Sequence, residues 1–271
     1  MPQDTPEQKS RRLIAHCVSC GHCRDLMAGS SCLFFPRLYR LHDRAAAGGP
    51  AISADEMKHL LELCNTCGIC PCPPVHAWIR EAKDAFIARD GLPWSTRLLE
   101  DVQLIGRLGS LLPPATNLLL GENLLGKGVK RFFKIHPERK LPRFPPESFG
   151  PWAEAQGLTQ MPTANGRKVA YFSGCTARYI FPEVAKASVE ILRRNGVAVY
   201  VPPQKCCGMP SMLEGDRALT FALARANIAE LVRCVEAGFD IVCSCPTCGY
   251  LLKSVLGDGA QFAPEYRSRV K

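Results

Sequence analysis

Two stretches of the sequence each place three cysteines with two residues between neighbours. The first is "CVSCGHC", with Cys17, Cys20 and Cys23, and the second is "CNTCGIC", with Cys64, Cys67 and Cys70. Three thiolates on so short a turn can reach three irons of one four-iron cluster. Zinc sites also use cysteines two residues apart, but as two pairs and not as a triplet. The repeat therefore predicts two cubane [4Fe–4S] clusters within residues 1–90.

Each triplet needs a fourth thiolate, and the same region contains two further cysteines, Cys32 and Cys72. In two-cluster ferredoxins the fourth cysteine comes from the other motif. We therefore expect Cys72 to complete the first cluster and Cys32 the second. The spacing departs from the ferredoxin pattern, which has three residues before the fourth cysteine, whereas this chain has eight and one. The opposite assignment of Cys70 and Cys72 stays open, because only one residue separates them.

Five more cysteines follow three predicted strands. The segments 167–173, 197–202 and 239–244 read as strands that alternate with helices, which favours a small parallel sheet. Loops at the carboxyl ends of such strands build binding sites. They contain Cys175, Cys206, Cys207, Cys245 and Cys248. Five thiolates exceed the need of one zinc or an ordinary cubane, whereas adjacent cysteines that point to opposite sides can bridge different irons of an opened cluster.

The third set resembles the cysteine-rich CCG domain of heterodisulfide reductase. A two-cluster ferredoxin module followed by CCG domains is similar to the iron–sulfur subunits of anaerobic glycerol-3-phosphate dehydrogenase and of glycolate oxidase. The segments that carry the resemblance are "ERKLPRFPPESF", "GRKVAYFSGC", "KCCGMP" and "SCPTCGYLLK". The resemblance implies an electron-transfer subunit whose partner is a flavoprotein dehydrogenase and whose acceptor is quinone, a thiol/disulfide couple or another carrier.

The resemblance also implies a ligand set for the CCG site. Its five cysteines would hold a third, non-cubane [4Fe–4S] cluster, and the alternatives are a structural zinc on four of them or a redox-active dithiol without metal. Members of the group usually carry two CCG modules, whereas this chain has one. We expect a natural single-module form, a fragment, or half of a split pair.

The whole chain is expected to be an α+β protein. Residues 1–90 would form a helical, ferredoxin-like two-cluster domain, 91–165 a Pro-rich and partly helical connector, 166–256 the CCG domain, and 257–271 a tail. "SADEMKHLLELC" predicts a helix capped by Ser53 and Glu56. The connector segments 95–112 and 115–133 read as amphipathic helices. We expect them to pack on the neighbouring domain, the alternative being a membrane or partner surface.

Charge and hydropathy limit the partners. The net charge is +9, and the densest basic stretch, 127–144, holds seven Lys and Arg against one Glu. We favour the interpretation that this basic stretch is a solvated face. The alternative is contact with an acidic partner or an anionic membrane surface. No nucleic-acid-binding motif accompanies the charge. The N-terminus has no apolar signal region, and the sequence contains no run of 18 apolar residues. We therefore expect a cytoplasmic protein. The alternative is peripheral attachment to the inner face of the membrane.

The remaining candidates are weaker. Cys234 and Cys243 are expected to be packing residues. His16 precedes the first triplet, His22 lies within it and His76 follows the second triplet. All three are expected to lie behind the ligands or at the surface. No phosphate loop or nucleotide-binding glycine pattern occurs, so flavin should sit on another chain. The rival functions are a heterodisulfide or thiol-disulfide reductase with the CCG cluster as its active site, and a scaffold protein with a structural zinc.

Overall fold

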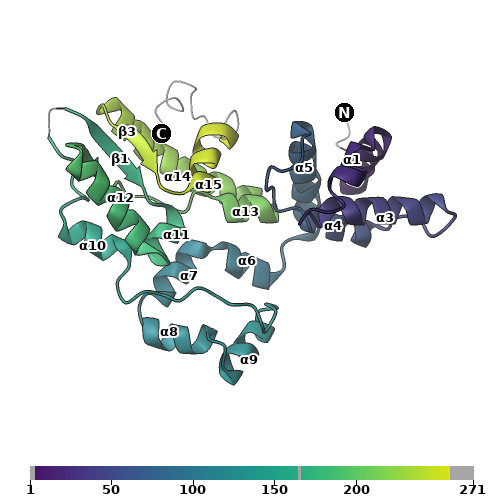
Figure 1. Ribbon diagram of the computed structural model, residues 1–271, viewed down its shortest axis with the longest axis horizontal. Coiled ribbons are helices and arrows are strands. Elements are labelled where there is room, and N and C mark those ends of the chain that lie inside the picture. Colours follow the sequence, from purple (N-terminus) through teal and green to yellow (C-terminus); the bar gives the residue numbers. More distant parts are fainter. Residues whose placement is uncertain (1–3, 164–165, 257–271) are drawn as a thin grey trace. The chain divides into compact units, whose positions relative to one another are not determined.

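The structure is a computed structural model that describes residues 4–163 and 166–256 (Figure 1). It is largely helical, with one parallel sheet of three strands, and this confirms the α+β class. The chain divides into two compact units. Unit 1 comprises Met1–Pro93 and Ser211–Arg217, and unit 2 comprises Trp94–Pro210 and Ala218–Lys271. The predicted tail 257–271 lies outside the described residues.

Unit 1 is built from helices around one apolar core. Buried side chains of its helices meet there, among them Leu13, Leu38, Leu60 and Phe86. Its helices are α1 (Pro6–Cys20), α2 (His22–Leu26), α3 (Phe34–Ala46), α4 (Ala54–Glu62) and α5 (Pro73–Asp90). No strand occurs among the described residues 4–93, so the two-cluster ferredoxin-like character of this region stays a prediction.

The start of α4 follows the sequence signal. The Ser53 hydroxyl accepts from the N–H of Glu56, and the Glu56 carboxylate accepts from the N–H of Ser53. This reciprocal pair satisfies two donors that a helix start leaves without partners. The predicted cap is confirmed.

Unit 2 contains the parallel sheet, with β1 (Lys168–Phe172) between β2 (Ala198–Tyr200) and β3 (Asp240–Cys243). Val169 of β1 pairs with Val199 of β2 and with Asp240 of β3. The three predicted strands are confirmed. Because all three run in the same direction, their carboxyl ends lie at one edge of the sheet.

Helices cover both faces of this sheet (Figure 1). Val169 and Tyr171 of β1 pack on α10 (Phe149–Ala155) and α12 (Pro182–Arg194). Ala170, between them, faces the opposite way and packs with Cys234 of α14 (Arg217–Glu236). This alternation is that of a strand buried on both sides.

A short helix follows each strand along the chain. These helices are α11 (Gly174–Tyr179) after β1, α13 (Met209–Glu214) after β2 and α15 (Pro246–Tyr250) after β3. A single turn of π-helix, Leu251–Val255, continues from α15. The cysteines of the third set lie in the turns that precede these helices or in their first turns, so the fold positions that set at one edge of the sheet.

The connector helices differ from the prediction of two long helices. Segment 95–112 breaks into α6 (Trp94–Glu100) and α7 (Val102–Gly109), and 115–133 breaks into α8 (Pro113–Leu120) and α9 (Leu124–Phe132). The Asp101 side chain accepts from the N–H of Leu104, and that of Asn123 accepts from the N–H of Gly126. Both residues start a new helix because capping side chains compete with helix continuation.

Candidate metal centres

The first triplet lies where α1 ends and α2 begins. Gly21 separates the helices with a left-handed φ of 67° and donates its N–H to the carbonyl of Cys17 at 2.9 Å. Burial, together with the charges of Cys23 and Cys72, raises the pKa of Cys17 to about 12. The structure therefore brings Cys72 close to the first triplet.

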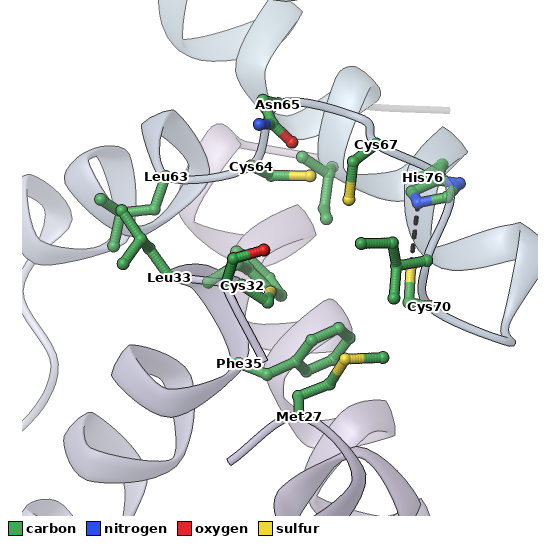
Figure 2. A pocket seen from close by; sticks show the side chains of 14 residues that line it. Met27, Cys32, Leu33, Phe35, Leu63, Cys64, Asn65, Cys67, Cys70 and His76 are labelled. Carbon is green, nitrogen blue, oxygen red and sulfur yellow. Dashed lines mark hydrogen bonds between the residues drawn. The ribbon is translucent and has the colours of Figure 1, made fainter. Parts of the chain in front are cut away.

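A cavity of about 120 Å³ lies at the second triplet (Figure 2). Its lining includes the four cysteines predicted to hold the second cluster, Cys32, Cys64, Cys67 and Cys70. Met27, Phe35 and Ile79 provide apolar walls. Engineered cavities of about 150 Å³ accept a benzene molecule, so this volume suits a compact group. Burial is the main cause that raises the pKa of Cys70 to about 11.

Two imidazoles contact the segment "CPC" at 70–72. Nε2 of His76, in the first turn of α5, lies 2.8 Å from Sγ of Cys70 (Figure 2). Nε2 of His16, near the end of α1, lies 3.9 Å from Sγ of Cys72. The ring of Trp78 packs edge-on against His16, with 4.8 Å between centroids. Sequence reasoning left both histidines without a defined partner, since their cysteine contacts depend on how the helices pack.

The thiols of unit 1 suit clusters better than single ions. A tetrahedral zinc with Zn–S bonds of about 2.3 Å holds its sulfurs about 3.8 Å apart. Within residues 4–163 and 166–256, no three Cys, His, Asp or Glu side chains converge closely enough to hold one ion. Ligands of a four-iron cluster bind different irons and are spread more widely. The assignment of the eight thiols of the two groups to clusters stays a prediction.

The third set forms a continuous series of neighbouring thiols. Sγ of Cys206 lies 3.8 Å from Sγ of Cys175. Cys207 interacts with Cys206 on one side and Cys248 on the other, and Cys248 also interacts with Cys245. The contact with Cys206, and then burial, raise the pKa of Cys175. The fold thus brings all five cysteines together from three strand ends, and the adjacent pair turns towards different neighbours.

Glycine makes room for this arrangement. Gly174 has a φ of 66°, which other residues rarely adopt, and a Cβ there would lie 2.8 Å from Sγ of Cys248. Only glycine fits this position without displacing the backbone or the Cys248 side chain. Gly208, after the cysteine pair, has a φ of 100° and allows the sharp turn into α13. Both glycines therefore adopt backbone conformations on which the arrangement of the five thiols depends.

The comparison with protein families concerns the part of the chain that contains the sheet. Residues 169–253 match the family model of the CCG cysteine-rich domain. All five cysteines of the third set lie within these residues. The chain carries a CCG domain. No solved structure matches the chain.

The relatives are iron–sulfur proteins and components of redox enzymes. One subunit of the anaerobic glycerol-3-phosphate dehydrogenase of Escherichia coli K12 is 23% identical over 158 residues, 58% of this chain and 39% of that protein. One subunit of the CoM/CoB fumarate reductase of Methanothermobacter marburgensis is 34% identical over 89 residues, 32% of this chain and 17% of that protein. An iron–sulfur protein of Methanococcus maripaludis is 31% identical over 88 residues, with the same coverage. The chain thus spans well under two thirds of each.

Two polar side chains fix the loops of the CCG domain. The buried Asn227 of α14 accepts from the N–H of Lys205 at 2.7 Å and donates to the carbonyl of Cys206 at 2.9 Å. The Gln204 amide accepts from the N–H of Gly174 at 3.3 Å and donates to the carbonyl of Tyr171 at 3.3 Å. Sequence reasoning missed both. The available signal was an Asn on the apolar stripe of a helix, where a polar side chain needs partners.

The other two cysteines of unit 2 have different surroundings. Cys234 is buried in the core between α14 and the sheet, as expected. Cys243 ends β3, where burial raises its pKa to about 12 and the charge of Cys245 adds to the shift. Its neighbour in the site is therefore Cys245, two residues further along the strand end.

Proposed function

We propose that the chain is an iron–sulfur electron-transfer subunit between a flavin-dependent dehydrogenase and an acceptor such as quinone, a thiol/disulfide couple or another carrier. The observation that carries this proposal is the cavity in unit 1 with the thiols of Cys32, Cys64, Cys67 and Cys70 in its walls. Relatives named as subunits of a dehydrogenase and a reductase support it.

The residues of unit 1 would act as ligands and not as catalysts. Cys17, Cys20, Cys23 and Cys72 would hold one [4Fe–4S] cluster, and Cys32, Cys64, Cys67 and Cys70 the other. Bound clusters of this type take up and release electrons one at a time. The apolar side chains of Met27, Phe35 and Ile79 would lower the polarity around the thiols on their side of the cavity, which affects the reduction potential.

The CCG domain would hold a third cluster, a non-cubane [4Fe–4S] group on its five cysteines. The different further neighbours of the adjacent pair support this choice, because Cys206 also contacts Cys175 and Cys207 also contacts Cys248. A structural zinc on four of the cysteines is the first alternative. The 3.8 Å between Cys175 and Cys206 suits tetrahedral zinc, but no three Cys, His, Asp or Glu side chains of the described residues converge as closely as one ion requires. A dithiol without metal is the second.

Counting electrons tests the electron-transfer role. Protein purified without oxygen is reduced with dithionite, desalted, and titrated with ferricyanide while the visible absorbance is followed. We expect Cys64→Ser to release about one electron fewer than wild type, because one cluster carries about one electron. Cys234→Ala, in the core of unit 2, should release as many electrons as wild type. A wild-type protein that dithionite does not bleach would contradict the proposal.

A disulfide reductase is the second candidate, favoured by the thiol series of the CCG domain. There the third cluster would be the active site, and electrons from the other two would reduce a disulfide bond to two thiols with uptake of two protons. Activity on a heterodisulfide with reduced viologen, lost in Cys206→Ser, would support this candidate. Zinc without iron in the purified protein would instead support the scaffold alternative.

We also propose that the hairpin of α8 and α9 contacts an anionic membrane surface on the cytoplasmic side. The two helices pack on each other and expose Leu118, Leu119, Leu124 and Leu125, of which Leu124 is 90% exposed. The rings of Trp94 and Phe132 are exposed, and their centroids lie 5.5 Å apart. No described helix is long and apolar enough to cross a bilayer. Apolar side chains next to aromatic and basic ones are typical of helices that lie in the membrane interface.

The charge of the neighbouring segment supports this surface. Of the seven basic residues in 127–144, Lys127 pairs with Glu138 at 2.8 Å and Lys140 lies 3.8 Å from Glu122. The stretch therefore keeps an excess of positive charge, and each Lys or Arg near an anionic surface adds about 1 kcal/mol of attraction.

Vesicle flotation at low salt tests this contact. The protein should float with vesicles of phosphatidylcholine and phosphatidylglycerol, and Leu124→Glu should abolish flotation. Ile191→Glu, which places the same charge on an exposed apolar position of α12, should leave it unchanged. Wild-type protein that stays at the bottom of the gradient would contradict the membrane contact.

A further inference from the structure

Histidines contact the candidate ligands at two places only, among the residues that the structure describes. His76 lies 2.8 Å from Cys70, and His16 lies 3.9 Å from Cys72. The exposed His22 lies within the first triplet, as the neighbour of Cys23, yet it makes no such contact within these ranges. Adjacency in sequence therefore does not explain the two contacts.

The two contacts serve different thiol groups. Cys70 lines the cavity of the second triplet, whereas Cys72 neighbours Cys17 of the first. Each group of four thiols consequently has one imidazole. The contacts also differ in strength, because the half-buried His76 is close to Sγ while His16 is exposed and more than 1 Å farther from its sulfur.

The helices of unit 1 hold both rings in place. His76 follows the buried Val75 in the first turn of α5, and Trp78 of the same helix packs against His16 near the end of α1. α1 and α5 lie against each other. The packing of these two helices therefore sets the direction of both imidazoles towards the segment 70–72.

We propose that His76 donates its Nε2–H to the Cys70 thiolate and raises the reduction potential of the cluster that Cys70 would hold. His16 does the same, more weakly, at Cys72. One electron added to a cluster increases the negative charge on its thiolates, so an N–H donor stabilises the reduced form more than the oxidised form. Both histidines are positioning and tuning residues, and the inference rests on the proposed function.

The size of the effect follows from the type of bond. Hydrogen bonds to charged groups are stronger than neutral ones, and the thiolate carries more charge after reduction. We expect loss of the His76 donor to lower the equilibrium constant for reduction of one cluster about tenfold, which is about 59 mV for one electron. Loss of His16 should lower that of the other cluster by a smaller factor.

A redox titration followed by electron paramagnetic resonance tests the inference on full-length protein purified without oxygen. His76→Leu should lower one midpoint potential, His76→Gln should restore part of the shift because its amide can donate, and His22→Leu should change neither potential. Iron and sulfide per chain are measured on every variant.

Each outcome decides between the claims. Wild-type potentials in His76→Leu at full iron content would overturn the role of His76 and leave the electron-transfer proposal standing. Loss of iron from His76→Leu alone would also overturn it, because His76 would then be needed for cluster binding and not for tuning. Wild-type protein without reducible clusters would refute both proposals.

Discussion

Replacing Asn227 by leucine should destabilise the CCG domain and empty its metal site. The amide makes two hydrogen bonds to the backbone at the start of the cysteine pair, one with the N–H of Lys205 and one with the carbonyl of Cys206. Leucine has the same branching and the same number of side-chain heavy atoms as asparagine, with somewhat larger terminal groups, and it keeps the buried position filled. The substitution therefore removes the two hydrogen bonds with little change in packing.

The magnitude follows from where the two backbone groups lie. Cys206 is buried, so its carbonyl loses its partner without gaining water, at a cost of about 1–3 kcal/mol. Lys205 is exposed, and its N–H can reach water, which limits that loss to about 0.5–1.5 kcal/mol. The sum of about 1.5–4.5 kcal/mol corresponds to a fall in Tm of roughly 3–18 °C for a unit of this size.

The assay is thermal unfolding followed by circular dichroism, with iron and zinc measured on the same samples. Arg225→Ala is the matched control, because Arg225 is an exposed residue of the same helix, two positions away. We expect Asn227→Leu to lose the metal of the CCG domain while the clusters of unit 1 remain. A Tm within about 1 °C of the wild-type value, with full metal content, would refute the reasoning, because that shift is below the range expected from the lost hydrogen bonds.

Two further changes have defined outcomes. Gly174→Ala should remove the metal of the CCG domain and leave unit 1 loaded, because its Cβ would lie 2.8 Å from Sγ of Cys248; equal metal content in the variant would contradict this. Hydrogen bonds from Arg44 lower the pKa of Glu56 to about 2, so its carboxylate stabilises the fold above pH 4.5 and this contribution is lost as the pH falls towards 2. The Tm difference between wild type and Glu56→Gln should therefore shrink below pH 4.5, and a difference that stays constant down to about pH 3 would refute the assignment.

Local signals in the sequence predict local structure well in this chain. The Ser53 cap and the three strands follow from capping and periodicity, which act over a few residues. The sequence pattern predicts two connector helices and the structure has four, because the caps Asp101 and Asn123 stand inside apolar periodic segments. There the capping signal outweighs the periodicity.

In the candidate sites, too, the sequence predicts the local motifs but not the contacts that depend on helix packing. Spacing is enough to nominate the triplets and the CCG cysteines, since each motif is short or lies after a strand. Helix packing brings His76 into contact with Cys70. It also brings the side chain of Asn227 within hydrogen-bonding distance of the carbonyl of Cys206. His76 is 6 positions from Cys70, and Asn227 is 21 positions from Cys206, separations over which periodicity carries no information about contact.

Iron, acid-labile sulfide and zinc per chain, measured on protein purified without oxygen, test the central claim most directly. Four irons per cluster give about eight for unit 1 and about twelve when the CCG domain holds a cluster as well. We expect about twelve irons, an equal amount of sulfide, and no zinc. About eight irons with one zinc would make the CCG domain structural, and zinc without iron would contradict the account of an electron-transfer protein altogether.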